Sequence, residues 1–256
     1  MSNQRVKGSM GFLSVLTVVG LLAVGAPAAH AVPALQLDIA GGFYDTATQT
    51  IMTSNNTFTL YALLNPTAPG VSATGTYYLS VALEPVRSTA ASLGSFSVNG
   101  TAVNATGGMT YGTPPLEGLL ATFDSGDLAQ HGMYPTYFKE YSFTFNSSNR
   151  SGVYNTQDTP GGIHAGTGLL YAAFQVDKSL LNSPYQLHFD LYSESLLTTR
   201  RQGVTLTDID INKFAPFSHD AGTTTRGVPE PSVALLLGIG LVGFGVWQRR
   251  SGAQSV

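Results

Sequence analysis

The chain has 256 residues, enough for one large or two small domains, and a formal net charge of −3 at pH 7. It has no Cys, which excludes disulfides, thiolate zinc sites and cysteine nucleophiles. Charged residues make up only 11% and hydrophobic residues 43%, a composition typical of strands and turns around a core. Residues 32–230 hold all fifteen acidic but only eight basic residues, so this body carries −7 and offers no electrostatic basis for binding nucleic acid.

Residues 1–31 are typical of a secretory signal peptide. Arg5 and Lys7 form a basic start, an apolar stretch follows from about 10 to 26, and Ala29 and Ala31 occupy the small positions that signal peptidase reads. We therefore predict cleavage after Ala31. The alternative is an uncleaved N-terminal membrane helix.

The body after this segment shows the two-residue periodicity of β-strands. Asn99-Gly100 is the strongest hairpin signal in the chain, and a change of phase near Asp208 suggests a β-bulge. The segment 168–177 is mostly apolar, which favours a strand covered on both faces. Strands are predicted within 34–53, 56–65, 75–85, 94–103, 140–146, 168–177, 185–193 and 204–214.

Eight to ten short strands with polar turns, and no convincing amphipathic helix, predict an all-β fold. We expect a single β-sandwich over residues 32–219, of jelly-roll or immunoglobulin-like type. Residues 220–228 are expected to form a short polar linker.

Four stretches of the body carry a resemblance to a known family. They read LQLDIAGGFYD (35–45), FTLYALLNP (58–66), HGMYPTYFKEYSFTF (131–145) and KFAPFSHDAG (213–222). This pattern resembles the choice-of-anchor N proteins. The resemblance implies an exported domain joined to a surface-anchoring tail, and it implies no catalytic residues.

The histidines of the body show no metal-type spacing, because His131, His164, His188 and His219 lie far apart in the sequence. His188 alternates with Leu187 and Phe189, so we expect it on the solvent face of its strand. His219 is interpreted as a structural, hydrogen-bonding residue. We predict no catalytic residue, no cofactor and no metal centre. One calcium-binding candidate is weighed against this prediction.

That candidate is the run Asp208, Asp210 and Asn212, whose oxygen-bearing side chains share one face of a regular strand. Lys213 follows and repels cations, so an exposed strand that resists aggregation is the preferred interpretation. The glycine-rich run 159–168 lacks the Gly-Lys-Ser/Thr of a phosphate loop and is interpreted as a mobile surface loop.

Two enzyme or binding alternatives depend on three-dimensional convergence. Glu117, Glu140 and Glu194 lie in separate segments, and a glycosidase pair among them would form only in the fold. Tyrosines of the predicted strands favour core packing, with a carbohydrate-binding face as the alternative.

The C-terminal tail combines a proline motif, an apolar run and a basic end. Residues 232–247 carry no charge and predict a transmembrane helix, and Arg249 and Arg250 act as a stop-transfer signal on the cytoplasmic side. Pro229 and Pro231 hold the Val228-Pro229-Glu230-Pro231 stretch extended, a shape suited to a protease groove. A rigid spacer before the helix is the alternative.

The order of these features, over residues 229–252, resembles the PEP-CTERM sorting signal of Gram-negative bacteria. A lipid-anchor tail would instead end in its apolar stretch. The resemblance implies recognition and removal by exosortase, a membrane protease, during export to the cell envelope or surface. We therefore expect a non-enzymatic surface or matrix protein, structural or adhesive, with extracellular polysaccharide as a candidate ligand. A secreted hydrolase or carbohydrate-binding module acting on such polysaccharide is the alternative.

Overall fold

The computed structural model describes residues 31–116, 128, 131–201 and 203–225. Within these residues the chain is all-β, as predicted, with one 3-10 turn, η1 (Phe217–His219), and no α-helix. The strands are β1 (Leu35–Ile39), β2 (Phe43–Asp45), β3 (Thr50–Thr53), β4 (Thr57–Leu64), β5 (Thr76–Glu84), β6 (Ser95–Val98), β7 (Thr101–Asn104), β8 (Thr110–Gly112), β9 (Thr136–Thr144), β10 (Arg150–Ser151), β11 (Leu169–Asp177), β12 (Gln186–Arg201), β13 (Val204–Phe214) and β14 (Ala221–Thr223).

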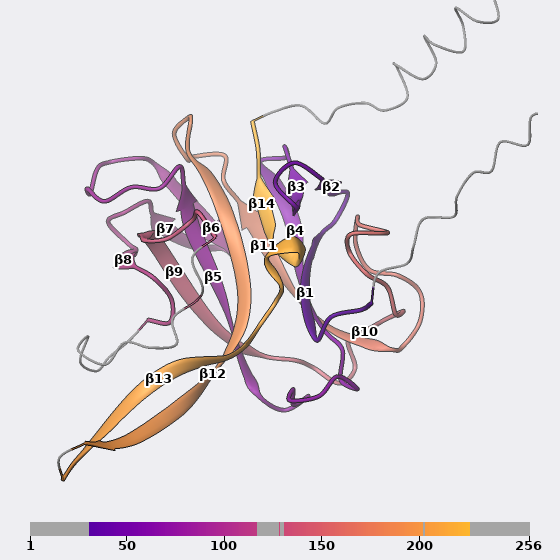
Figure 1. Ribbon diagram of the computed structural model, residues 1–256. Coiled ribbons are helices and arrows are strands. Elements are labelled where there is room, and N and C mark those ends of the chain that lie inside the picture. Colours follow the sequence, from indigo (N-terminus) through magenta and orange to yellow (C-terminus); the bar gives the residue numbers. More distant parts are fainter. Residues whose placement is uncertain (1–30, 117–127, 129–130, 202, 226–256) are drawn as a thin grey trace, which may run out of the picture.

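The strands form two sheets (Figure 1). One sheet has the order β1-β4-β11-β6-β7, with β10 paired to β11. The other has the order β2-β3-β14-β12-β5-β9-β8, with β13 paired to β12. The pairs are antiparallel except β14 with β3, which is parallel. The jelly-roll or immunoglobulin-like assignment within this two-sheet architecture stays a prediction.

One hydrophobic core joins the two sheets. It takes Leu37 and Leu60 from the first sheet and Val81 and Leu187 from the second, all with no exposed surface. The alternation that predicts the strands is also what places these side chains on facing surfaces. Phe58 and Phe189 meet edge to face across the core, with ring centroids 6.0 Å apart.

The predicted hairpin at Asn99-Gly100 is confirmed. It joins β6 to β7, and Asn99 (φ 50°) and Gly100 (φ 78°) both have the positive φ that a two-residue turn of this kind requires. A longer hairpin, β12–β13, projects from the body (Figure 1). Beyond Tyr192, β12 pairs only with β13 among the described strands, and Leu196 and Val204 lie exposed in this part of the hairpin.

Three sequence expectations need correction. The register of β12 and β13 runs unbroken past Asp208 and shifts at Asn212 instead, so the bulge lies four residues later. Strand β11 is not covered on both faces, because Ala173 and Gln175 are exposed. Residues 221–223, expected in the linker, form β14 between β3 and β12, so the β domain extends beyond residue 219.

Loops cover part of the outer face of each sheet. On the second sheet, Leu128, Met133 and Tyr134 pack on Ala82 and Tyr192 and form a smaller core there. On the first sheet, Tyr154 and the backbone near Gly161 cover Asp38. Polar side chains that alternation directs away from the main core are therefore buried as well.

None of the helical structure in the described part of the chain is long and apolar enough to cross a membrane. The predicted transmembrane helix at 232–247 lies outside the described residues, as does the predicted signal peptide up to residue 30.

Candidate functional site

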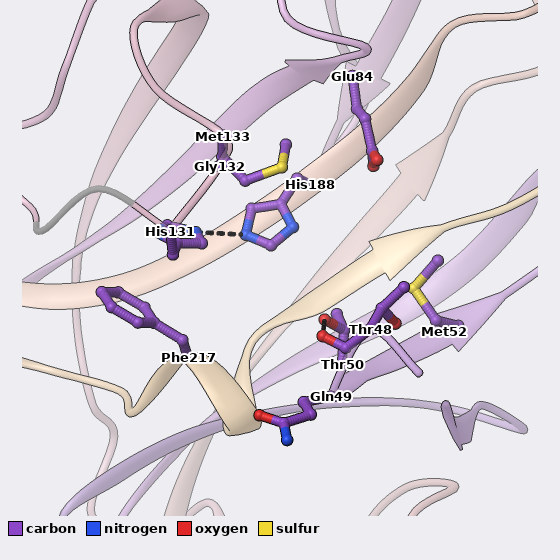
Figure 2. A pocket seen from close by; sticks show the side chains of 10 residues that line it. All are labelled: Thr48, Gln49, Thr50, Met52, Glu84, His131, Gly132, Met133, His188 and Phe217. Carbon is purple, nitrogen blue, oxygen red and sulfur yellow. Dashed lines mark hydrogen bonds between the residues drawn. The ribbon is translucent and has the colours of Figure 1, made fainter. Parts of the chain in front are cut away.

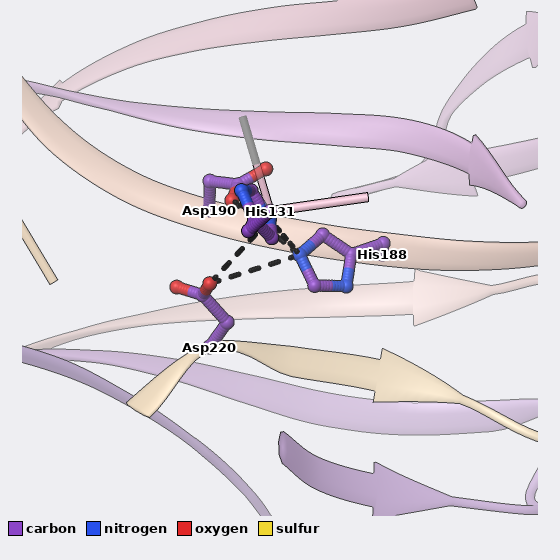
Figure 3. A group of neighbouring side chains, drawn as sticks. All are labelled: His131, His188, Asp190 and Asp220. Carbon is purple, nitrogen blue, oxygen red and sulfur yellow. Dashed lines mark hydrogen bonds and ion pairs between the residues drawn. The ribbon is translucent and has the colours of Figure 1, made fainter. Parts of the chain in front are cut away.

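Two histidines and two aspartates converge on the outer side of the second sheet (Figure 3). His188 and Asp190 are two residues apart on β12, so they share the face opposite Leu187, Phe189 and the main core. Asp220 lies between η1 and β14, and His131 lies in the segment that precedes β9.

Each of the four side chains directs one nitrogen or oxygen atom toward the other three. The Nε2 atoms of His131 and His188 are 3.2 Å apart. Asp190 Oδ1 lies 3.2 Å from His131 Nε2 and 3.4 Å from His188 Nε2. Asp220 Oδ2 lies 3.8 Å from each of the same two nitrogens. All four atoms therefore surround one point.

Neighbouring aromatic residues hold this cluster in place. The Tyr134 hydroxyl donates to Asp190 Oδ2 and lies 2.9 Å from Ser80 Oγ, which leaves Asp190 Oδ1 facing the histidines. The ring of Phe217 stacks on His131 with centroids 4.1 Å apart. These contacts fix the orientation of an imidazole and a carboxylate from outside the cluster.

Burial and mutual charge shape the electrostatics of the cluster. Burial alone lowers the pKa of His188, but the Asp190 and Asp220 carboxylates more than reverse this and raise the pKa to about 10. Burial would raise the pKa of Asp190, yet the charges of His188 and His131 and their contacts hold it below its usual value. Burial and the neighbouring Asp190 raise the pKa of Asp220. The site thus stabilises positive charge between the two carboxylates.

A pocket of about 510 Å³ opens beside the cluster (Figure 2). His131 and His188 line it together with Glu84, Met133 and Phe217, while Asp190 and Asp220 are not among its lining residues and are each only 1% exposed. The two imidazoles therefore border the pocket, and the two carboxylates are buried next to them without lining it.

The expectation that His188 faces solvent is wrong, because its side chain is only 8% exposed. Alternation correctly places it away from the main core, but the ring of His131 lies 5.2 Å from its ring and Phe217 stacks on His131. No spacing rule links residues 131, 188, 190 and 220. The only local signal for the cluster is His188 and Asp190 on one strand face, which a sequence search for metal motifs passes over. His219 has the hydrogen-bonding role predicted for it, through Ser218 Oγ and Asn155 Oδ1.

A second buried polar site explains the glycine-rich loop. Asp38 Oδ1 accepts hydrogen bonds from the backbone N–H groups of Ile39 and Gly161, and Oδ2 accepts from Gly162 N–H and Tyr154 Oη, at 2.7–3.0 Å. Gly161 and Gly162 have positive φ, which glycine adopts without strain. The start of the 159–168 loop, which was predicted to be mobile, is therefore hydrogen-bonded to Asp38 of β1.

The glutamates predicted as a possible glycosidase pair partly converge. Glu140 on β9 and Glu194 on β12 are near enough for Glu140 to raise the pKa of Glu194, and the Tyr192 hydroxyl donates to Glu140. Whether these two carboxylates act as a glycosidase pair stays a prediction. Glu117 lies outside the described residues.

The calcium candidates lie along β13. Asp208 is buried and accepts a hydrogen bond from Ile209 N–H, Asp210 is half-buried, and Asn212 is exposed at the bulge. The bulge interrupts the alternation that would place all three on one face. Among the tyrosines, Tyr77, Tyr134 and Tyr192 are buried, as the core interpretation expects.

The predicted processing residues stand apart from these clusters. Ala31 is described and exposed, and its carbonyl accepts a hydrogen bond from Asn155 Nδ2. Ala29, Val228, Pro229, Glu230, Pro231, Arg249 and Arg250 lie outside the described residues. Their predicted roles in signal cleavage, sorting and stop-transfer therefore depend on the sequence alone.

Residues 227–250 match the PEP-CTERM protein-sorting motif. The PEP-CTERM match confirms the resemblance of the tail, and it indicates an exported, membrane-anchored precursor that exosortase processes at the cell surface. The comparisons give no support to the resemblance of the body to choice-of-anchor N proteins. No curated protein and no solved structure matches the chain.

Proposed function

We propose that this chain is a structural or adhesive protein of the cell surface or matrix, without catalysis of its own. The observation that carries the proposal is the PEP-CTERM motif joined to an all-β body. Signal peptidase removes residues 1–31, the helix at 232–247 holds the precursor in the membrane, and exosortase reads Val228-Pro229-Glu230-Pro231.

The described part of the body supports an adhesive role through its shape. The β12–β13 hairpin projects from the sheets and exposes Leu196 (67%) and Val204 (58%), apolar side chains well suited to contact a partner surface (Figure 1). The acidic charge of the body argues against nucleic acid as that partner. Extracellular polysaccharide is the ligand class we propose.

A hydrolase acting on extracellular polysaccharide is the second candidate. It is favoured by the pocket that His131, His188 and Glu84 line. One assay separates the adhesive role from the hydrolase. The mature protein is incubated with polysaccharides of its host, and the reducing ends released are measured. Binding without release supports the adhesive role, and release that stops in a Glu84→Gln variant supports the hydrolase.

The sorting part of the proposal is tested by the mass of the mature protein in a Pro229→Ala/Pro231→Ala variant. The extended conformation is lost, so we expect the tail to be retained. Pro66→Ala, in the loop after β4, is the matched control and should be processed like the wild type. Normal removal of the tail in the double variant would refute recognition through this stretch.

A further inference from the structure

We propose that His131, His188, Asp190 and Asp220 bind one divalent transition-metal ion of the zinc class, through two imidazole nitrogens and two carboxylate oxygens. This site is independent of the sorting tail and of the adhesive role, and it shares His131 and His188 with the pocket of the hydrolase candidate. Its consequence is structural: the ion ties the segment before β9 to β12 and to the turn before β14.

The distances between the four atoms carry the argument. Zinc bonds to His nitrogen and carboxylate oxygen are about 2.0–2.1 Å, which places the corners of a tetrahedron about 3.3 Å apart. Five of the six separations are 3.2, 3.2, 3.4, 3.8 and 3.8 Å, and the sixth is within 4.8 Å. The atoms already stand close to the positions that a four-coordinate ion requires.

The hydrogen bonding inside the cluster gives an independent indication. Asp190 Oδ1 and Asp220 Oδ2 are buried and accept no hydrogen bond of good geometry, although two imidazole nitrogens lie nearby. Buried carboxylate oxygens without such bonds are costly and call for an explanation. A cation at the centre satisfies both oxygens at once.

Charge and ligand type select the class of ion. Two carboxylates and two neutral imidazoles balance a divalent cation. Mixed nitrogen and oxygen ligands suit zinc and its neighbours, whereas calcium takes six to eight oxygen ligands at longer distances. Four protein ligands close the coordination sphere, which is typical of a structural site rather than a catalytic one.

The surroundings have the features of a supported metal site. Tyr134 and Ser80 orient Asp190, and Phe217 stacks on His131, so the ligands are held without the ion. The pocket provides a path for the ion to reach the imidazoles from solvent (Figure 2).

The test uses the mature protein purified from its host. After treatment with a chelator, titration with Zn²⁺ should show one ion per chain, and saturating Zn²⁺ should raise Tm by about 5–10 °C. Ca²⁺ should give neither effect. Cobalt(II) should produce the intense visible absorption of a tetrahedral complex. Absence of stoichiometric zinc binding would overturn the proposal. The four residues would then form an ion-pair network without a metal ion.

Variants assign the binding to these residues. His131→Ala changes a residue outside the strands and should abolish tight binding, while Tyr134→Phe should weaken it by about 10–100-fold. His164→Ala removes a histidine that stacks on Tyr154, away from the cluster, and should bind zinc like the wild type. Circular dichroism verifies folding, and Asp190→Asn replaces His131→Ala if that variant does not fold. Undiminished zinc affinity in a folded His131→Ala or Asp190→Asn protein would overturn the proposal.

Discussion

Replacing Asp38 with Ala should strongly destabilise the β domain. The substitution leaves two buried donors from distant residues without an acceptor, Gly162 N–H and Tyr154 Oη, and one part-buried donor, Gly161 N–H. Each unsatisfied buried donor costs about 1–3 kcal/mol, so the gross loss from the two buried donors is about 2–6 kcal/mol. Burial raises the pKa of Asp38, which shows that the site disfavours its charge, and removal of that charge offsets part of the loss. We expect a net loss of about 2–4 kcal/mol.

The assay is urea unfolding of the mature protein, read by circular dichroism, for Asp38→Ala and for a matched control. Asp45→Ala removes an aspartate that also accepts two hydrogen bonds, from Ala47 N–H and Thr48 Oγ1, but both are exposed. It should cost about 1 kcal/mol or less. Asp38→Asn keeps one acceptor oxygen and should fall between the two. Equal losses for Asp38→Ala and Asp45→Ala would show that the buried carboxylate does not hold the glycine loop.

Further outcomes follow from the same structure. A Cβ at Gly94 would meet Leu180 O at 2.0 Å, so Gly94→Ala should lower the free energy of unfolding by about 2–4 kcal/mol. Gly100 also has positive φ but stands in open space, so Gly100→Ala should lower it by only about 1 kcal/mol. Similar urea midpoints for the two variants would contradict this. Burial and the nearby Glu140 raise the pKa of Glu194 from its ordinary 4.5 to about 7. The folded state therefore holds this proton more tightly than the unfolded state, and Glu194 makes stability fall as the pH rises from about 4.5 to 7. Thermal melts across that range should show a shallower fall for Glu194→Gln, and parallel curves would refute the assignment.

The sequence was sufficient for most strands and the main core, because two-residue alternation depends on nearest neighbours along the chain. The short strands β8, β10 and β14 were not predicted. The sequence also located the Asn99-Gly100 hairpin, since positive φ at both positions is a local requirement. It could not show what covers the outer faces. Alternation directs His188 and Asp38 away from the main core, and both are buried by segments far away in sequence.

The histidine–aspartate cluster is not predictable from the sequence for the same reason. Its members come from β12, from the segment before β9 and from the turn before β14. Only the strand order, which places β14 next to β12, brings Asp220 to His188. By contrast, the sorting motif is contiguous, so sequence alone was enough to recognise it.

The most direct test of the account is the intact mass of the protein at the surface of its host, with and without exosortase. The account predicts a chain that begins at Val32 and lacks the segment after the Val228–Pro231 stretch when exosortase is present, and that keeps this segment when exosortase is deleted. A surface protein that retains residues 232–256 in both strains would contradict it.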